Sequence, residues 1–379
     1  MERRKVSVPD PQTIAETLSS LRQQSLAAAG QALPPMRAMV VNLVAHADRR
    51  AAAEEMANQV AAVAEQHPSR AIVVASEPAA GPQGLDIYVW AHCHAAAVER
   101  LVCFEGVEIL ARGPAVERLP AIVASLLLRD LPVVLWWPGD LPVGTPLFEH
   151  LLASTDRLVV DSAAARDPGE LLQRLVALGQ PERCPCTVSD LNWQRLTTWR
   201  ELTAQLFDPP DCRAYLARLS RVRLELAGGA GQPGDAQALL LVGWLATRLA
   251  WRPAPAPWRR TPAGDALVLR RDGEPVTVER VWLPGGGAGL HALTLAAGED
   301  GGQATFILRR SPPGDQAEVA IRLPGAPSRQ RTVPLPEPKP GELLAAELAS
   351  LARDPTYSDA LRLAAQLSAQ RPPKAPGAG

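Results

Sequence analysis

The chain has 379 residues, of which 47% are hydrophobic and 21% charged, and its formal net charge at pH 7 is -1. This length suggests two or three domains with a sizeable core. The near-neutral charge argues against a nucleic-acid-binding protein, which normally carries a basic excess. The composition also argues against a disordered chain.

Cysteine content and apolar segments bear on the cellular compartment. Five cysteines without a regular spacing do not form a disulfide framework and favour a reducing environment. The charged N-terminus is not followed by the apolar stretch of a signal peptide. The longest apolar runs, 119–128 and 236–247, are shorter than the roughly 20 residues that a membrane span needs. We therefore expect a cytoplasmic protein that does not enter a membrane.

The first half of the chain predicts an N-terminal helix within residues 1–35 and an α/β domain over residues 36–185. Asp10 and Pro11 are suited to the N-cap and first position of that helix. Apolar strands at 38–45 and 71–75 flank an alanine-rich helix at 48–65, and this order predicts a parallel strand pair. Further strands are expected at 85–90, 98–110, 133–137 and 158–160, and further helices at 116–128, 145–153 and 168–178.

The second half predicts a different organisation. Residues 186–260 read as a mainly helical connector with one strand at 222–227 and a proline-rich linker from Pro253 to Pro262. Residues 261–370 predict a β-rich domain with two closing helices, and residues 371–379 a disordered tail. Its strands are expected at 266–270, 276–283, 290–295, 304–308 and 318–323, and its helices at 342–353 and 358–369. The predicted fold class is an α/β N-terminal domain with a mixed sheet, a helical middle segment, and an α+β C-terminal domain with an antiparallel sheet.

Two glycine-rich segments are candidates for phosphate binding. Gly229–Gly234 has the G-x-G-x-x-G spacing of a dinucleotide fingerprint between a predicted strand and a predicted helix. However, Pro233 interrupts the turn and no acidic residue follows at the required distance, so we interpret the segment as a loop with Asp235 as a helix N-cap. The glycines at 285–289 lack a following helix N-terminus. We predict no cofactor.

The sequence gives little support for a metal site or for a reactive cysteine. In the His-Cys-His segment at 92–94, a strand would direct the cysteine away from the two histidines, and the C-x-C spacing of Cys184 and Cys186 is not a zinc pattern. We predict no metal site. Cys184 and Cys186 occur in a polar loop and are expected to be exposed, so together with Cys212 they are candidates for a redox role. No motif of a catalytic triad, metalloprotease or kinase is present.

Two tryptophan-containing clusters stand out instead. Trp136 and Trp137 end an apolar strand and point to opposite faces, at the carboxyl end where open α/β sheets place their sites. Either both belong to the core or one faces a ligand or partner. The segment 190–201 combines Trp and Arg, which are frequent at interface hot spots, and Thr198 and Glu201 suggest a capping box. The segment is therefore either part of a partner interface or a buried polar network that joins two domains.

Four segments occur in a fixed order: HPSR at 67–70, LPVVLWWPG at 131–139, DRLVVDS at 156–162 and DLNWQRLTTWRE at 190–201. Their identity and order closely resemble the OpcA family, the glucose-6-phosphate dehydrogenase assembly proteins of cyanobacteria and actinobacteria. The resemblance is best over residues 36–251. It implies a non-catalytic protein that binds the dehydrogenase, promotes its active oligomer and raises its activity at low glucose 6-phosphate, without nucleic acid or membrane as partner. Cyanobacterial members are also tied to redox control, although no particular cysteine here matches.

The resemblance transfers no catalytic residues and provides only candidate partner-binding positions. These are His67, Arg70, Trp136, Trp137, Asp190, Asn192, Trp193, Arg195, Trp199 and Arg200. The alternative is an α/β enzyme or ligand-binding protein that acts on a nucleotide or sugar phosphate, with a site near residues 136–140 and Arg70. A redox sensor based on the cysteines is a further alternative.

Overall fold

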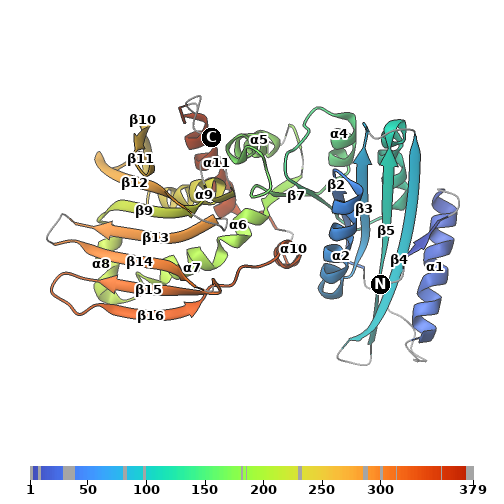
Figure 1. Ribbon diagram of the computed structural model, residues 1–379, viewed down its shortest axis with the longest axis horizontal. Coiled ribbons are helices and arrows are strands. Elements are labelled where there is room, and N and C mark those ends of the chain that lie inside the picture. The colour runs from blue at the N-terminus through green and yellow to red at the C-terminus, as the bar shows by residue number, and fades with distance from the viewer. Residues whose placement is uncertain are drawn as a thin grey trace. The chain divides into compact units, whose positions relative to one another are not determined.

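A computed structural model of the chain describes residues 3–6, 10–28, 39–79, 83–96, 100–180, 182–184, 186–228, 233–284, 289–298, 302–312, 314–350 and 352–372. The chain forms two compact units, each built on an eight-stranded sheet (Figure 1). The first unit comprises Met1–Val160, Gly179–Ser189 and Lys339–Ala352, and the second comprises Asp161–Leu178, Asp190–Pro338 and Arg353–Gly379.

The sheet of the first unit has the strand order β1-β4-β5-β3-β2-β6-β7-β8. Its strands are β1 (Arg4–Lys5), β2 (Val41–Ala47), β3 (Ser69–Glu77), β4 (Gly84–Ala96), β5 (Arg100–Arg112), β6 (Val133–Pro138), β7 (Arg157–Asp161) and β8 (Thr187–Asp190). β2 pairs in parallel with β3 and β6, and β3 with β5, whereas β4 runs antiparallel to β5. The predicted mixed sheet and its parallel βαβ pair are confirmed.

Buried apolar side chains cross this sheet in register. Val44 on β2 pairs with Ile72 on β3 and Leu135 on β6, and Ile72 pairs with Val107 on β5. All four are buried, as expected for parallel strands covered on both faces.

The helical elements of the unit are α1 (Pro11–Ala28), α2 (Arg50–Gln66), the 3-10 helix η1 (Gly113–Arg118), α3 (Leu119–Leu126), α4 (Pro146–Ala153) and α10 (Pro340–Leu348). As predicted, Asp10 caps α1, since its Oδ1 accepts hydrogen bonds of 3.0 Å from two backbone N–H groups.

The sheet of the second unit has the order β10-β11-β12-β9-β13-β14-β15-β16. Its strands are β9 (Leu219–Ala227), β10 (Arg252–Thr261), β11 (Gly264–Arg271), β12 (Glu274–Leu283), β13 (Gly289–Ala297), β14 (Ala304–Ser311), β15 (Gln316–Arg322) and β16 (Arg329–Pro334). Neighbouring strands are antiparallel except β9 and β12, which are parallel. The β-rich C-terminal part is confirmed, with β9 from the middle segment inserted at its centre.

Helices cover one face of this second sheet. They are α5 (Pro168–Leu178), α6 (Leu191–Arg195), α7 (Thr197–Gln205), α8 (Pro210–Leu216), α9 (Pro233–Arg248) and α11 (Pro355–Ala369). α9 packs on β9 and β13, and α11 packs on α9 and α5. Gly243 permits the close approach of α9 and α11, because a Cβ at this position would lie 2.3 Å from the carbonyl oxygen of Ala360.

Some local predictions are wrong for identifiable reasons. The proline-rich segment 253–262 is largely strand β10 and not a linker, and its position at the sheet edge explains why its prolines are tolerated. Thr198 does not cap a helix, because α7 already begins at Thr197 and the cap of the preceding α6 is Asp190. Strands β1, β8 and β16 are not predicted, since they are short or largely polar. Over the described residues, none of the helices is long and apolar enough to cross a membrane.

Candidate functional site

The strand order of the first unit points to a specific crevice. Numbered along the chain, β2, β3, β5, β6, β7 and β8 are arranged as 3-2-1-4-5-6. Doubly wound sheets of this order bind dinucleotides at the carboxyl ends of the strands, where the strand order reverses. In this chain the reversal lies between β2 and β6, so the ends of these two strands are the first place to search for a site.

Aromatic rings occupy the ends of these strands. The imidazole of His46 on β2 stacks on the indole of Trp137 on β6, with ring centroids 3.5 Å apart and planes 9° apart. Phe148 of α4 contacts Trp137 edge-on at 5.2 Å, and Nε2 of His46 lies 2.7 Å from the hydroxyl of Ser76. Burial lowers the pKa of His46 to about 3, so the imidazole is neutral and joins β2 to β6 as part of the core.

Both adjacent tryptophans are therefore core residues of the first unit. Trp136 and Trp137 retain 3% and 4% of their accessible surface. Of the interpretations left open by the sequence, the structure favours the one in which both belong to the core. A direct contact of either side chain with a partner stays a prediction.

The turn that follows β2 lacks the features that bind pyrophosphate. Dinucleotide domains place glycines in this turn and a helix N-terminus behind it, and an acidic residue after the second strand binds the ribose. The sequence has no glycine between Val41 and Ala80. The acidic residue at the end of β3, Glu77, instead accepts a 2.8 Å hydrogen bond from the backbone N–H of Arg50, the first residue of α2. The helix N-terminus is thus capped by a carboxylate of the chain itself, and these residues do not fit a dinucleotide.

The other ligand motifs fall largely outside the described residues. Residues 229–232 and 285–288 of the glycine segments lie there, as do the side chains of His92, Cys93 and His94. Asp235 lies inside the first turn of α9 and not at the predicted N-cap, and it forms an ion pair with Arg280. Within the described part of the chain, no group of three His, Cys, Asp or Glu residues is arranged to hold a metal ion.

The segment 190–201 forms a buried polar network in the second unit. Oδ1 of Asp190 accepts backbone hydrogen bonds from Ser162 (3.0 Å) and Asn192 (2.9 Å), and the Asn192 amide donates to the Ser162 hydroxyl at 3.0 Å. Arg195 binds both carboxylate oxygens of Asp161, at 2.6 and 2.8 Å. Burial, and secondly the charge of Asp161, raise the pKa of Asp190 to about 6. Asp190 therefore positions the start of α6.

Tryptophans of the same segment anchor α6 and α7. The indole N–H of Trp193 donates to Asp354 at 2.9 Å, and the guanidinium of Arg200 lies 3.6 Å above the Trp193 ring. Burial lowers the pKa of Arg200 to about 10. Trp199 is 3% exposed. The structure thus shows a buried network within the second unit, while a role in partner binding stays a prediction.

Arg70 and His67 lie away from the tryptophan pair. Arg70 stands near the start of β3, where it forms an ion pair with the buried Glu105 and donates at 3.2 Å to the carbonyl of Leu126. His67 follows α2 and is half-buried. In the strand register Arg70 aligns with Val133, whereas Trp137 lies at the other end of β6. The structure does not bring Arg70 and Trp137 together, so the single site expected for a nucleotide or sugar-phosphate enzyme is not formed.

The cysteine predictions require correction. Cys184 and Cys186 are joined by a disulfide and are both buried, so the expected exposed thiols are wrong for this pair. Cys212 on α8 is buried, and burial followed by the charge of Asp211 raises the pKa of its thiol. A raised pKa disfavours the reactive thiolate.

The first unit thus has the architecture of a dinucleotide-binding domain whose phosphate-binding turn is absent, and the second is a sheet covered by helices. The fold is similar to the crystal structure of glucose-6-phosphate 1-dehydrogenase from Mycobacterium avium, with a TM-score of 0.50 over 88% of this chain and 92% of that chain. At 14% identity this likeness concerns the fold alone.

Comparison of the sequence identifies the family. Residues 60–177 match the family model described as the glucose-6-phosphate dehydrogenase subunit N-terminal domain, and residues 186–361 match its C-terminal domain. The chain therefore belongs to the OpcA family of glucose-6-phosphate dehydrogenase assembly proteins. The sequence resemblance is confirmed.

Curated relatives named OxPP cycle protein OpcA agree with this assignment. The protein from Synechocystis sp. is 33% identical over 193 residues, which span 50% of this chain and 39% of that relative. The protein from Synechococcus elongatus is 28% identical over 321 residues, 82% of this chain and 70% of the relative. The alignment with the Synechocystis protein thus spans well under two thirds of that relative's length.

Proposed function

We propose that this protein acts in the cytoplasm as a non-catalytic partner of glucose-6-phosphate dehydrogenase, which it holds in the active oligomer and activates. The observation that carries the proposal is the contact of Glu77 with the N-terminus of α2. Because this carboxylate occupies the helix N-terminus that would bind a pyrophosphate, the dehydrogenase-like fold lacks a working dinucleotide-binding turn. Family membership supplies the partner, since the two matching domain models describe a subunit of this enzyme.

Activation of this kind requires differential binding. A partner shifts an enzyme toward its active state only if it binds that state better than the inactive one. A tenfold shift corresponds to about 1.4 kcal/mol of coupling free energy. One or two well-placed interface residues provide this amount, so a large rearrangement of this protein is not needed.

The candidate partner-binding residues divide by exposure. Arg70, Trp136, Trp137, Asp190, Asn192, Trp193 and Trp199 are buried within their own unit. We propose that these buried residues do not touch the dehydrogenase and instead hold the partner-binding surface in its folded conformation. His67, Arg195 and Arg200 are partly exposed, and we propose these three for direct contact.

The test measures dehydrogenase activity against glucose 6-phosphate concentration, with the enzyme of the same organism and with or without this protein. Light scattering on the mixture determines the size of the complex. We expect a lower half-saturation concentration and a larger particle. Unchanged kinetics without a complex would reject the proposal.

A second measurement addresses catalysis and cofactor binding. Because Trp137 lies at the reversal point of the sheet, titration of this protein alone with NADP⁺ should leave its tryptophan fluorescence unchanged. The protein alone should also show no dehydrogenase activity. Saturable quenching together with turnover would show that the crevice is functional and would contradict the non-catalytic assignment.

A further inference from the structure

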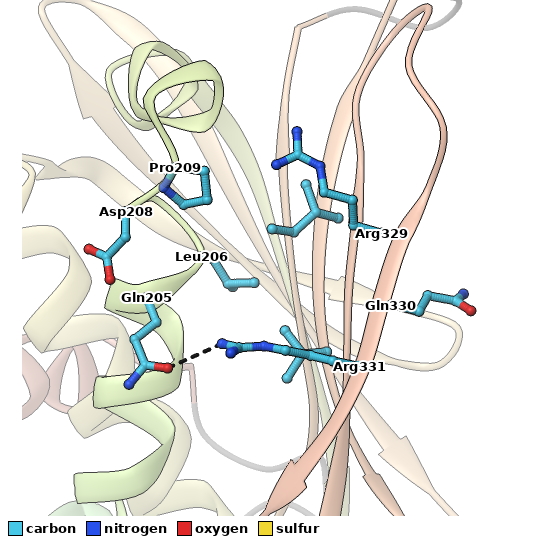
Figure 2. A pocket seen from close by; sticks show the side chains of 9 residues that line it. Gln205, Leu206, Asp208, Pro209, Arg329, Gln330 and Arg331 are labelled. Carbon is cyan, nitrogen blue, oxygen red and sulfur yellow. Dashed lines mark hydrogen bonds between the residues drawn. The ribbon is translucent and has the colours of Figure 1, made fainter.

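The second unit contains a groove of about 460 Å³ in which apolar and charged side chains meet. It lies between the segment that joins α7 to α8 and the strands β15 and β16. Its apolar lining consists of Leu206, Pro209, Val319 and Ile321, and its polar lining consists of Gln205, Asp208, Arg329, Gln330 and Arg331. In Figure 2 the side chains of Arg329 and Arg331 reach across the groove toward the α7–α8 segment, whereas Gln330 points away.

The groove arises where the covered face of the sheet reaches its edge. A row of paired residues, Leu224, Leu293, Leu308 and Val319, crosses the strands from β9 to β15 and is buried. The next residue in this row is Arg331 on β16. The neighbouring row likewise passes from Ile321 to Arg329. In these two rows the apolar face therefore ends in a cationic side chain on β16.

The edge strand itself is open. In the described structure β16 pairs with β15 and is the last strand of its sheet. Five of its six residues are exposed. In an antiparallel pair, every second residue of an edge strand directs its backbone N–H and C=O groups away from its partner. One wall of the groove thus offers main-chain hydrogen bonds to an extended segment.

The two arginines differ in how their charge is balanced. Arg329 forms an ion pair with Asp211, and this guanidinium lowers the pKa of the Asp211 carboxyl. Arg331 donates to the neutral side-chain oxygen of Gln205 at 3.2 Å. Among the residues that the structure describes, Arg331 has no carboxylate partner. The groove therefore presents one guanidinium without an ion-pair partner above an apolar floor, with the carboxylate of Asp208 elsewhere in its lining.

We propose that this groove docks a short extended segment of the dehydrogenase in which an apolar side chain stands next to a carboxylate. This inference rests on the proposed function, because it takes the dehydrogenase as the partner. The apolar side chain covers the half-buried Pro209 and Ile321, the carboxylate pairs with Arg331, and the main chain pairs with β16. A single unpaired cation balances one carboxylate, whereas a sugar phosphate dianion would leave one negative charge unbalanced in a groove that also contains Asp208.

Charge reversal with a matched control tests the contact. Arg331→Glu places a carboxylate in the groove, and Arg322→Glu makes the same charge change at an exposed position of β15 whose side chain projects from the other face of the sheet, away from Ile321. The equilibrium dissociation constant of each full-length variant for the dehydrogenase is measured by calorimetry. We expect binding to weaken at least about tenfold for Arg331→Glu and to change less than twofold for Arg322→Glu. Equal affinities for both variants and the wild type would overturn the inference.

Photo-crosslinking provides a readout that does not depend on a charge reversal. A benzophenone amino acid replaces Asp208 on the groove wall or, as control, Arg322. We expect the groove position to capture a dehydrogenase peptide that contains an acidic residue, identified by mass spectrometry, and the control position to capture none. If the wild type forms no complex, the proposed function fails and the inference fails with it. If the complex forms but the groove position captures no dehydrogenase peptide, the inference alone is rejected.

Discussion

His46 should make the first unit sensitive to acid. In the folded protein burial lowers the pKa of this imidazole to about 3, against an ordinary value of 6.5. As the pH falls below about 6.5, the unfolded chain binds a proton that the folded chain does not bind, so the free energy of unfolding decreases. At pH 5 the loss amounts to about 2 kcal/mol. His46→Phe keeps an aromatic ring against Trp137 and removes the titration, so it should lack this part of the acid sensitivity.

Urea unfolding at pH 7.5 and pH 5, followed by tryptophan fluorescence, measures this difference. On going from pH 7.5 to pH 5, the wild type should lose about 2 kcal/mol more free energy of unfolding than His46→Phe. His150→Gln removes an exposed histidine of α4 and should show no comparable gain. If the curves of wild type and His46→Phe shift in parallel between the two pH values, the imidazole is not held neutral by burial and the account of the ring stack is wrong.

Three further predictions concern the second unit. Because the pKa of Asp190 is raised to about 6, this carboxyl makes a contribution to the free energy of unfolding that is lost as the pH rises from about 4 to 6. Over this range the melting temperature of Asp190→Asn should therefore rise relative to that of the wild type, and a difference that stays constant would contradict this account. Arg280→Met removes a fully buried guanidinium that pairs with Asp235 and Asp265. The free energy of unfolding, measured in urea, should fall by about 3 kcal/mol, against less than about 0.5 kcal/mol for the exposed Arg259→Met. Gly243→Ala forces a methyl group to within 2.3 Å of the Ala360 carbonyl and should cost about 1–3 kcal/mol; an unchanged melting temperature would show that α9 and α11 separate easily.

Much of the fold was predictable, because local patterns dominate wherever a strand is apolar. The strand at 71–75 and the helix at 168–178 correspond to β3 and α5. The failures share a cause, since four of the six residues of β16 are polar and β10 is rich in proline. Both become strands by pairing at the edges of an existing sheet. No local signal in a sequence carries that information.

The candidate sites were predictable only in part, because their chemistry depends on residues far apart in sequence. The tryptophan pair and the segment 190–201 were identified from the sequence, yet the partners that bury them were not. His46 and Trp137 are neighbours through strand register, and Trp193 reaches Asp354 across a long stretch of chain. The sequence carries no signal for the groove, since Arg331 lies on the edge strand β16, which was not predicted.

The proposed activation has a consequence that binding alone can test. Because the first unit lacks a dinucleotide turn, activation must arise from contact with the enzyme and not from delivery of cofactor. Coupling between two binding events is reciprocal, so a partner that tightens substrate binding by a given factor is itself bound more tightly by that factor in the presence of substrate. If this protein tightens glucose 6-phosphate binding to the dehydrogenase about fivefold, saturating glucose 6-phosphate must lower the dissociation constant of the complex about fivefold. Calorimetry of complex formation with and without substrate measures this ratio. If the dissociation constant is the same in both cases, this protein does not tighten substrate binding and its effect is limited to the catalytic step.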